Sequence, residues 1–133
     1  MADDANRPDF ATGSCLCGSV RYRVQGRLRD VMICHCVFCR RMNTHVGAYT
    51  SCTSCAVADL QIESQRTLRS SPKARRGFCG KCGSALFWEP TPLTHISISA
   101  GSLNEPTGLK IKEHHCSAQK GNYYEITDGL PQR

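Results

Sequence analysis

The chain has 133 residues, of which 40% are hydrophobic and 21% charged, and its formal net charge is +6. This composition fits one soluble globular domain, and no apolar run is long enough to span a membrane. Acidic residues stand near the N-terminus where a secretory signal would have basic ones, and no apolar segment follows them. We therefore predict a cytoplasmic protein with a flexible lead-in at residues 1–12 and one domain at residues 13–133.

The basic residues are scattered along the chain, apart from one short group at Lys73, Arg75 and Arg76. Aromatic residues make up only 7% of the chain, which is little for a surface that stacks on the bases of single strands. Each metal-bound cysteine also carries a negative charge that the formal balance leaves out. We therefore do not expect nucleic acid to be the main partner.

The first elements in chain order are a strand, a second short strand and a short helix. Residues 13–26 alternate so that Val20, Tyr22 and Val24 face a core while the arginines between them face solvent. Residues 30–33 are a second extended run, and residues 37–45 fit one or two helical turns with arginines late in the turn.

The rest of the chain is also typical of short strands. The expected elements are strand-like residues 47–62, a polar loop at 67–76, a cysteine turn and apolar strand at 78–89, a strand at 94–103 and a hairpin-like segment at 114–133. Leu86, Phe87 and Trp88 are expected in the core. The fold class is therefore all-β with little helix, and we expect metal ions to hold it together where a larger core would otherwise be needed.

Ten cysteines are unusual in a chain of this size. In a reducing compartment, this density indicates metal ligands or catalytic thiols. A disulfide between Cys15 and Cys17, with one residue between them, would be badly strained. Metal binding meets no such obstacle, so the spacing favours metal over disulfides.

The motif CGKCG at residues 79–83 is typical of a zinc knuckle, because two residues between cysteines let both sulfurs reach one ion. Gly80 and Gly83 permit the tight turn that points backbone N–H groups at the thiolates. The second pair is expected in the CLC motif, where alternate residues of a strand share a face. The predicted structural zinc ligands are Cys15, Cys17, Cys79 and Cys82.

A separate trio stands in the motif CHCVFC, and we predict that it holds a second zinc ion. Its members are Cys34, Cys36 and Cys39. Three protein ligands with an open fourth position are typical of a catalytic zinc. Alternatively, another side chain completes the tetrahedron and makes the site structural. The candidates for that role are His35, His45, Cys52, Cys55 and Cys116.

Three other groups are weaker candidates. His95 alternates with serines and is expected at the surface. His114 and His115 are adjacent, so on a strand they point to opposite faces and at most one of them enters a given pocket. Arg40 and Arg41 follow the trio and would favour an anionic substrate.

Together, GSCLCGSVRYRV, CHCVFCRR, RRGFCGKCGSALF and the closing YYEITDGLPQ resemble the glutathione-dependent formaldehyde-activating (GFA) family, which shares its domain with centromere protein V. The resemblance runs from about Gly13 to Gln132. It implies a zinc-tethered β-tent fold of small antiparallel sheets. Thr44 stands where the family commonly has a glycine, and Cys52, Cys55 and Cys116 lie outside the family pattern.

The resemblance also implies which residues bind zinc. The structural site of the family corresponds to the same four cysteines paired above, and its second site corresponds to the trio, so two zinc ions are expected per chain. The family histidine ahead of the last strand aligns best with His114.

The family activity is the condensation of formaldehyde with glutathione to S-(hydroxymethyl)glutathione, a carbon–sulfur lyase reaction run in reverse. The resemblance therefore implies a zinc-dependent enzyme that handles glutathione or a related small thiol, with the trio as the catalytic residues. Two alternatives remain at this point. One is a non-catalytic zinc module that binds protein or nucleic acid, and the other is a redox protein that cycles the trio or the CTSC cysteines.

Overall fold

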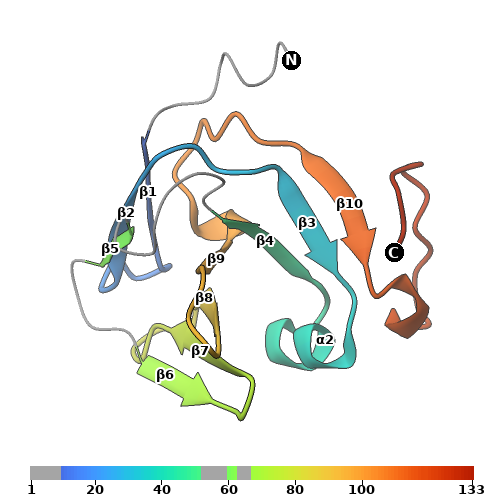
Figure 1. Ribbon diagram of the computed structural model, residues 1–133, viewed down its shortest axis with the longest axis horizontal. Coiled ribbons are helices and arrows are strands. Elements are labelled where there is room, and N and C mark those ends of the chain that lie inside the picture. Colours follow the sequence, from blue (N-terminus) through green and yellow to red (C-terminus); the bar gives the residue numbers. More distant parts are fainter. Residues whose placement is uncertain (1–9, 52–59, 63–66) are drawn as a thin grey trace.

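A computed structural model describes residues 10–51, 60–62 and 67–133 (Figure 1). These residues form a three-stranded sheet in the order β1-β2-β5 and a seven-stranded sheet in the order β10-β3-β4-β9-β8-β7-β6. The strands are β1 (Phe10–Ser14), β2 (Arg21–Gln25), β3 (Val31–Cys34), β4 (Gly47–Ser51), β5 (Leu60–Ile62), β6 (Thr67–Ser70), β7 (Ala74–Phe78), β8 (Ala85–Pro90), β9 (Ser97–Ser99) and β10 (Ile111–His115). The all-β prediction is confirmed.

Helical structure in the described residues is short. It consists of α2 (Val37–Asn43) and two 3-10 turns, η2 (Ala100–Ser102) and η3 (Ser117–Gln119). The helical turns predicted within residues 37–45 are therefore confirmed. Thr44 ends α2 in the left-handed conformation, with φ 63°, which glycine adopts most easily. No helix in the described part of the chain is long and apolar enough to cross a membrane.

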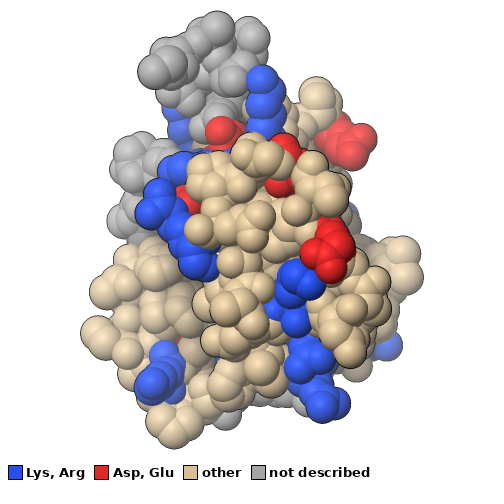
Figure 2. Space-filling view, turned by 90° about the vertical axis from the view of Figure 1, so that its right-hand side faces the viewer, with Lys and Arg blue, Asp and Glu red and all other residues tan. Residues whose placement is uncertain are grey.

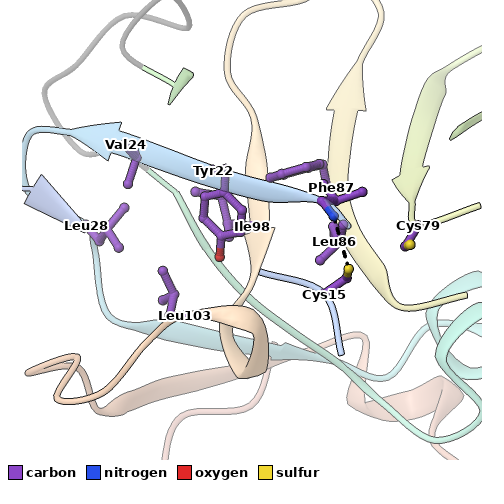
Figure 3. Packing of buried hydrophobic residues seen from close by; sticks show 10 residues of the cluster. Cys15, Tyr22, Val24, Leu28, Cys79, Leu86, Phe87, Ile98 and Leu103 are labelled. Carbon is purple, nitrogen blue, oxygen red and sulfur yellow. Dashed lines mark hydrogen bonds between the residues drawn. The ribbon is translucent and has the colours of Figure 1, made fainter. Parts of the chain in front are cut away.

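The core lies between the two sheets and is built on the alternation of β2. Tyr22 and Val24 are buried on one side of this strand, while Arg21 and Arg23 are exposed on the other. The ring of Tyr22 meets Phe87 of β8 edge-on, with centroids 5.2 Å apart (Figure 3). The apolar cluster also contains Cys15, Val20, Leu28, Cys79, Leu86, Ile98 and Leu103. Because two cysteines belong to this cluster, the core reaches the predicted structural metal site.

The prediction of a polar loop at residues 67–76 is wrong. These residues form a hairpin in which β6 pairs antiparallel with β7, and β7 continues the sheet through β8. Ser71 closes the turn, since its N–H donates to the carbonyl of Ala74 at 2.8 Å. The polar sequence gives no apolar alternation here, because this hairpin lies at the edge of the sheet, as Figure 1 shows.

The C-terminal segment also differs from the expected hairpin. β10 pairs in parallel with β3, with His115 opposite Cys34. After η3 the chain returns to make one parallel bridge between His114 and Gln132, so it does not form an antiparallel hairpin. An ion pair between Arg133 and the buried Glu113 fastens this end. At the other end, β1 begins at Phe10, three residues before the expected domain boundary.

Candidate metal centres and the adjoining cavity

Four sulfurs converge at the end of the core. The Sγ atoms of Cys15, Cys17, Cys79 and Cys82 all lie within 4.8 Å of one another. The distance from Cys15 to Cys17 is 3.6 Å and that from Cys17 to Cys79 is 3.7 Å. A tetrahedron with Zn–S bonds of about 2.3 Å has edges of about 3.8 Å, so this spacing fits a zinc ion.

The turns around these sulfurs supply hydrogen-bond donors. The N–H groups of Lys81 and Cys82 each lie 3.4 Å from the Cys79 sulfur, and that of Val20 lies 3.2 Å from the Cys15 sulfur. A hydrogen bond from Ser84 lowers the pKa of Cys82 to about 5. Gly83 has φ +81°, a left-handed conformation that closes the knuckle. These contacts favour the thiolate forms that bind metal.

The CLC motif was expected on a strand, and this prediction is wrong. Cys15 follows β1, and the N–H of Gly18 donates to its carbonyl at 3.2 Å, so Cys15 and Cys17 lie in a turn between β1 and β2. The two sulfurs converge because of the turn and not because of strand alternation. The site thereby joins the β1–β2 turn to the β7–β8 turn.

A second group of three sulfurs lies at the end of β3. The Sγ atoms of Cys34, Cys36 and Cys39 lie within 4.8 Å of one another. Cys36 is the N-cap of α2, and its sulfur accepts the N–H of Cys39 at 3.3 Å. A hydrogen bond with Cys39 lowers the pKa of Cys34 to about 5, while the same contact raises the pKa of Cys39. The clustered thiolates repel one another, and a bound cation would relieve this repulsion.

Two histidines proposed as a fourth ligand have other partners. Burial lowers the pKa of His35, whose Nε2 lies 2.9 Å from Nδ1 of His114 and whose Nδ1 meets the Tyr124 hydroxyl. His45 is exposed and contacts the Tyr123 hydroxyl through Nδ1. Neither histidine places a ring nitrogen in the compact group of potential metal ligands that the three sulfurs form.

The three cysteines proposed for the same role differ in position. Cys52 and Cys55 lie outside the described residues. Cys116 follows β10, and burial, together with the negative charge of the nearby Cys34, raises the pKa of Cys116. Its sulfur is not part of the compact group. Cys116 is therefore a neighbour of Cys34 and not a member of the compact trio.

Strand alternation places His35 and His114 on the side of the sheet away from the sulfurs. On β3, Met32 and Cys34 face one side, while Ile33 and the following His35 face the other. On β10, His115 lines the cavity beside the trio and His114 lines a cavity on the opposite side. The prediction that His114 and His115 point to opposite faces is confirmed.

His114, the residue aligned with the family histidine, belongs to a hydrogen-bond chain in which both histidines are buried and Asp128 is exposed. Its Nε2 lies 2.7 Å from a carboxylate oxygen of Asp128, and its Nδ1 meets His35. With both rings neutral, Tyr124 donates to His35, His35 to His114, and His114 to Asp128. This chain fixes the backbone between Cys34 and Cys36 from the side away from the sulfurs.

A cavity of about 350 Å³ opens beside the three sulfurs. Its lining comes from α2, from six strands of the seven-stranded sheet and from the segments that precede β3, α2 and β9. It consists of Arg29, Met32, Cys34, Cys36, Phe38, Cys39, Tyr49, Arg76, Trp88, His95, Ser97 and His115. Arg40 and Arg41, which were expected to attract an anionic substrate, are not among the lining residues. Arg29 and Arg76 do line the cavity, and the sequence did not predict this position for either of them.

Trp88 was expected in the core and instead faces this cavity. It is half-buried and packs against His95, with ring centroids 5.9 Å apart. Its neighbour Phe87 points the other way into the core. Alternation along β8 could have shown that Phe87 and Trp88 lie on opposite faces, but the sequence gives no sign that the second face borders a cavity.

Tyr49 closes the sulfur end of the cavity. Burial raises its pKa to about 12, so its hydroxyl stays protonated at neutral pH. The side-chain amide of Asn43 donates to the Tyr49 oxygen at 3.1 Å, so the hydroxyl keeps its own proton to donate, and the Cys39 sulfur is one acceptor within its reach. The Tyr49 ring lies against Gly47, where an added Cβ would come within 2.4 Å of the ring and 3.2 Å of the Cys39 sulfur.

The sequence matches the family described as "Glutathione-dependent formaldehyde-activating enzyme" (GFA) over residues 10–119. The match spans most of the chain, and the protein belongs to this family, as its three cysteine motifs had indicated. A crystal structure of a Rhodobacter sphaeroides protein shares the fold, with a TM-score of 0.55 and 24% sequence identity, over 71% of this chain and 88% of that chain. No curated protein matches the sequence.

Gly47→Ala is expected to disturb the trio while leaving the fold intact, because the new Cβ must displace the Tyr49 ring or the Cys39 sulfur. Metal analysis should then find about one zinc per chain in the variant, against the two that we expect in the wild type. Gly101→Ala is the matched control, since a Cβ there meets no atom within 4 Å. Two zinc ions retained by Gly47→Ala would contradict this account of the packing.

The two clusters should differ in their effect on stability. Cys82→Ser removes a ligand of the site that joins two turns next to the core, and we expect the free energy of unfolding to fall by several kcal/mol, about 3 or more. Cys36→Ser should cost about 1 kcal/mol or less, because a serine can still cap α2 and the trio does not join two distant turns. Urea unfolding of the zinc-loaded variants measures both values, and equal losses would contradict the division into a structural and a second site.

Proposed function

We propose that this protein is a zinc-dependent enzyme that handles glutathione or a related small thiol and forms or breaks a carbon–sulfur bond, as in the formation of S-(hydroxymethyl)glutathione from formaldehyde. The observation that carries the proposal is that Cys34, Cys36 and Cys39 all line a cavity large enough for a small ligand. Family membership points to the same chemistry. We propose the cytoplasm as its location.

The residues of the cavity divide into three roles in this proposal. Cys34, Cys36 and Cys39 would hold zinc, which when bound supplies a thiolate at neutral pH by lowering the pKa of a thiol in its fourth position. Arg76 offers a positive charge for a carboxylate of the thiol. Tyr49 donates a hydrogen bond to the aldehyde oxygen as the sulfur attacks the carbonyl carbon. The S–C bond forms, the C=O double bond becomes a single bond, and the proton that left the thiol ends on the oxygen, which becomes a hydroxyl.

The charge of Arg76 is available for a ligand. Its guanidinium lies over the Phe38 ring, 5.3 Å from the centroid, and it forms no ion pair with a described carboxylate. Arg29 is held more firmly, because its guanidinium donates to the carbonyls of Asp30 and Tyr49. Arg76 is therefore the better anchor for the anionic groups of glutathione.

The alternative of a nucleic-acid module gains no support from the basic group at residues 73–76. Arg75 pairs with the buried Glu89 at 3.5 Å, whereas Arg76 lines the cavity, so adjacent arginines of β7 face different ways. On the face that Figure 2 shows, Lys and Arg side chains stand in separate groups and form no continuous band. A phosphate backbone is contacted best by a continuous basic surface.

Titration calorimetry with reduced glutathione tests the proposal. The zinc-loaded wild type should release or absorb heat on binding, and Cys36→Ser should lose this signal because the thiol no longer meets a three-cysteine metal site. Cys17→Ser, in the other cluster, is the comparison for general loss of metal. Glutathione binding that survives in Cys36→Ser would sink the proposed mechanism.

Arg76→Gln should weaken glutathione binding by about tenfold, the effect of losing one charge-assisted contact. Arg41→Gln removes the same charge from an exposed position of α2 that does not line the cavity, and it should change the affinity less than twofold. The measurement is again calorimetry, at fixed ionic strength. Equal losses in both variants would mean that overall charge and not Arg76 attracts the thiol.

Tyr49→Phe should lower the rate of adduct formation above the uncatalysed background by about tenfold to hundredfold, with little change in glutathione affinity. Exchange spectroscopy by NMR at equilibrium measures this rate. Zinc content serves as the control, because an intact trio is required for the comparison. A variant with full rate would remove Tyr49 from the reaction.

A further inference from the structure

The cavity beside the trio offers more than formaldehyde requires, and the inference that follows deepens the proposed function and rests on it. Formaldehyde has no substituent on its carbonyl carbon, so its reaction needs room for little beyond the thiol. The cavity has a volume of about 350 Å³. The residues that line it therefore indicate which chemical group the aldehyde carries on its carbonyl carbon.

The cavity lies across the second face of the seven-stranded sheet. Cross-strand pairs place Met32 opposite Tyr49, and Arg76 opposite Trp88, which in turn lies opposite Ser97. The neighbours on the other face, Phe87 and Ile98, belong to the core. One face of the sheet thus builds the core, and the other provides a rigid wall for a ligand.

Apolar groups dominate this wall away from the sulfurs and Arg76. Met32 and Trp88 come from the sheet, and Phe38, which is 67% exposed, projects from α2 on the other side. His95 packs on Trp88 and extends the flat surface. Glutathione is a charged, hydrophilic tripeptide without an aromatic or branched apolar group, so these side chains match no part of it well.

We propose that this cavity holds the apolar substituent of an aldehyde larger than formaldehyde, and that the site makes and breaks thiol adducts of aldehydes that carry an aromatic or branched aliphatic group. The thiol sulfur bonds to the carbonyl carbon, the C=O double bond becomes a single bond, and the thiol proton ends on the oxygen. No oxidant or reductant takes part. The substituent packs between Phe38 and Trp88 while the sulfur remains at the trio.

Binding of two inert analogues tests the inference without turnover. S-benzylglutathione and S-methylglutathione mimic the adducts of benzaldehyde and formaldehyde and differ only in the apolar group. The zinc-loaded protein should bind the benzyl compound about tenfold tighter or more. Trp88 is the one tryptophan of the chain, so its fluorescence reports occupation of the cavity directly. Equal affinity for the two analogues would overturn the inference.

Variants locate the apolar group. Trp88→Ala should reduce the benzyl advantage to about threefold or less, as measured by calorimetry. Met32→Ala should reduce it as well and keeps the fluorescent reporter, so it decides the question if Trp88→Ala does not fold. Leu93→Ala removes an exposed apolar side chain that does not line the cavity and should leave the advantage unchanged. An advantage that persists in both cavity variants would place the benzyl group elsewhere and overturn the inference.

Exchange rates with glutathione separate this inference from the proposed function. Benzaldehyde, glycolaldehyde and formaldehyde are each compared with their uncatalysed rates. Acceleration that is greater for benzaldehyde than for the polar glycolaldehyde, with a ratio that falls about tenfold in Trp88→Ala, supports the inference. Acceleration of formaldehyde with no preference for benzaldehyde over glycolaldehyde overturns the inference and keeps the proposed function. No acceleration with any aldehyde overturns both.

Discussion

The structure depends on the convergence of four sulfurs from two distant turns. Cys17 and Cys79 are 62 residues apart in the chain, and their Sγ atoms lie 3.7 Å apart. Cys15 and Cys79 also belong to the apolar cluster between the sheets, so the sulfur site continues a core that is small for ten short strands (Figure 3). A metal ion there would hold the β1–β2 turn against the β7–β8 turn and thereby fix the sheet that carries the second group of sulfurs.

The alternation of side chains along strands then decides what reaches the second group. Cys34 and His35 are neighbours in sequence but face opposite sides of the sheet, and so do His115 and His114. On the side of His35, the histidines are engaged in a hydrogen-bond chain that ends at Asp128. The side of Cys34 carries the three sulfurs and the cavity that Arg29, Arg76 and several apolar side chains line. Although several histidines lie nearby, the compact group of potential metal ligands consists of three sulfurs, and a cavity opens beside it.

The sequence predicted those features that depend on short-range patterns. The alternation of β2, the short helix that contains Cys39 and both cysteine groups follow from residue spacing, and the structure has all of them. The β6–β7 hairpin was missed because its residues at the sheet edge carry no apolar alternation, and the parallel pairing of β10 with β3 joins segments about 80 residues apart. The approach of Cys116 to Cys34 depends on that pairing, as the place of Trp88 in the cavity depends on the curvature of the whole sheet.

The central claim is that one sulfur group is complete and the other has three protein ligands and a free position. Cadmium-113 NMR of the protein loaded with two cadmium ions tests it most directly, because each site gives its own resonance and the shift reports the number of bound thiolates. The account predicts one resonance typical of four thiolates and one typical of three, and the second alone should move when glutathione is added. Two resonances typical of four thiolates, one of which changes in Cys116→Ser, would show that Cys116 closes the second site and would contradict the account.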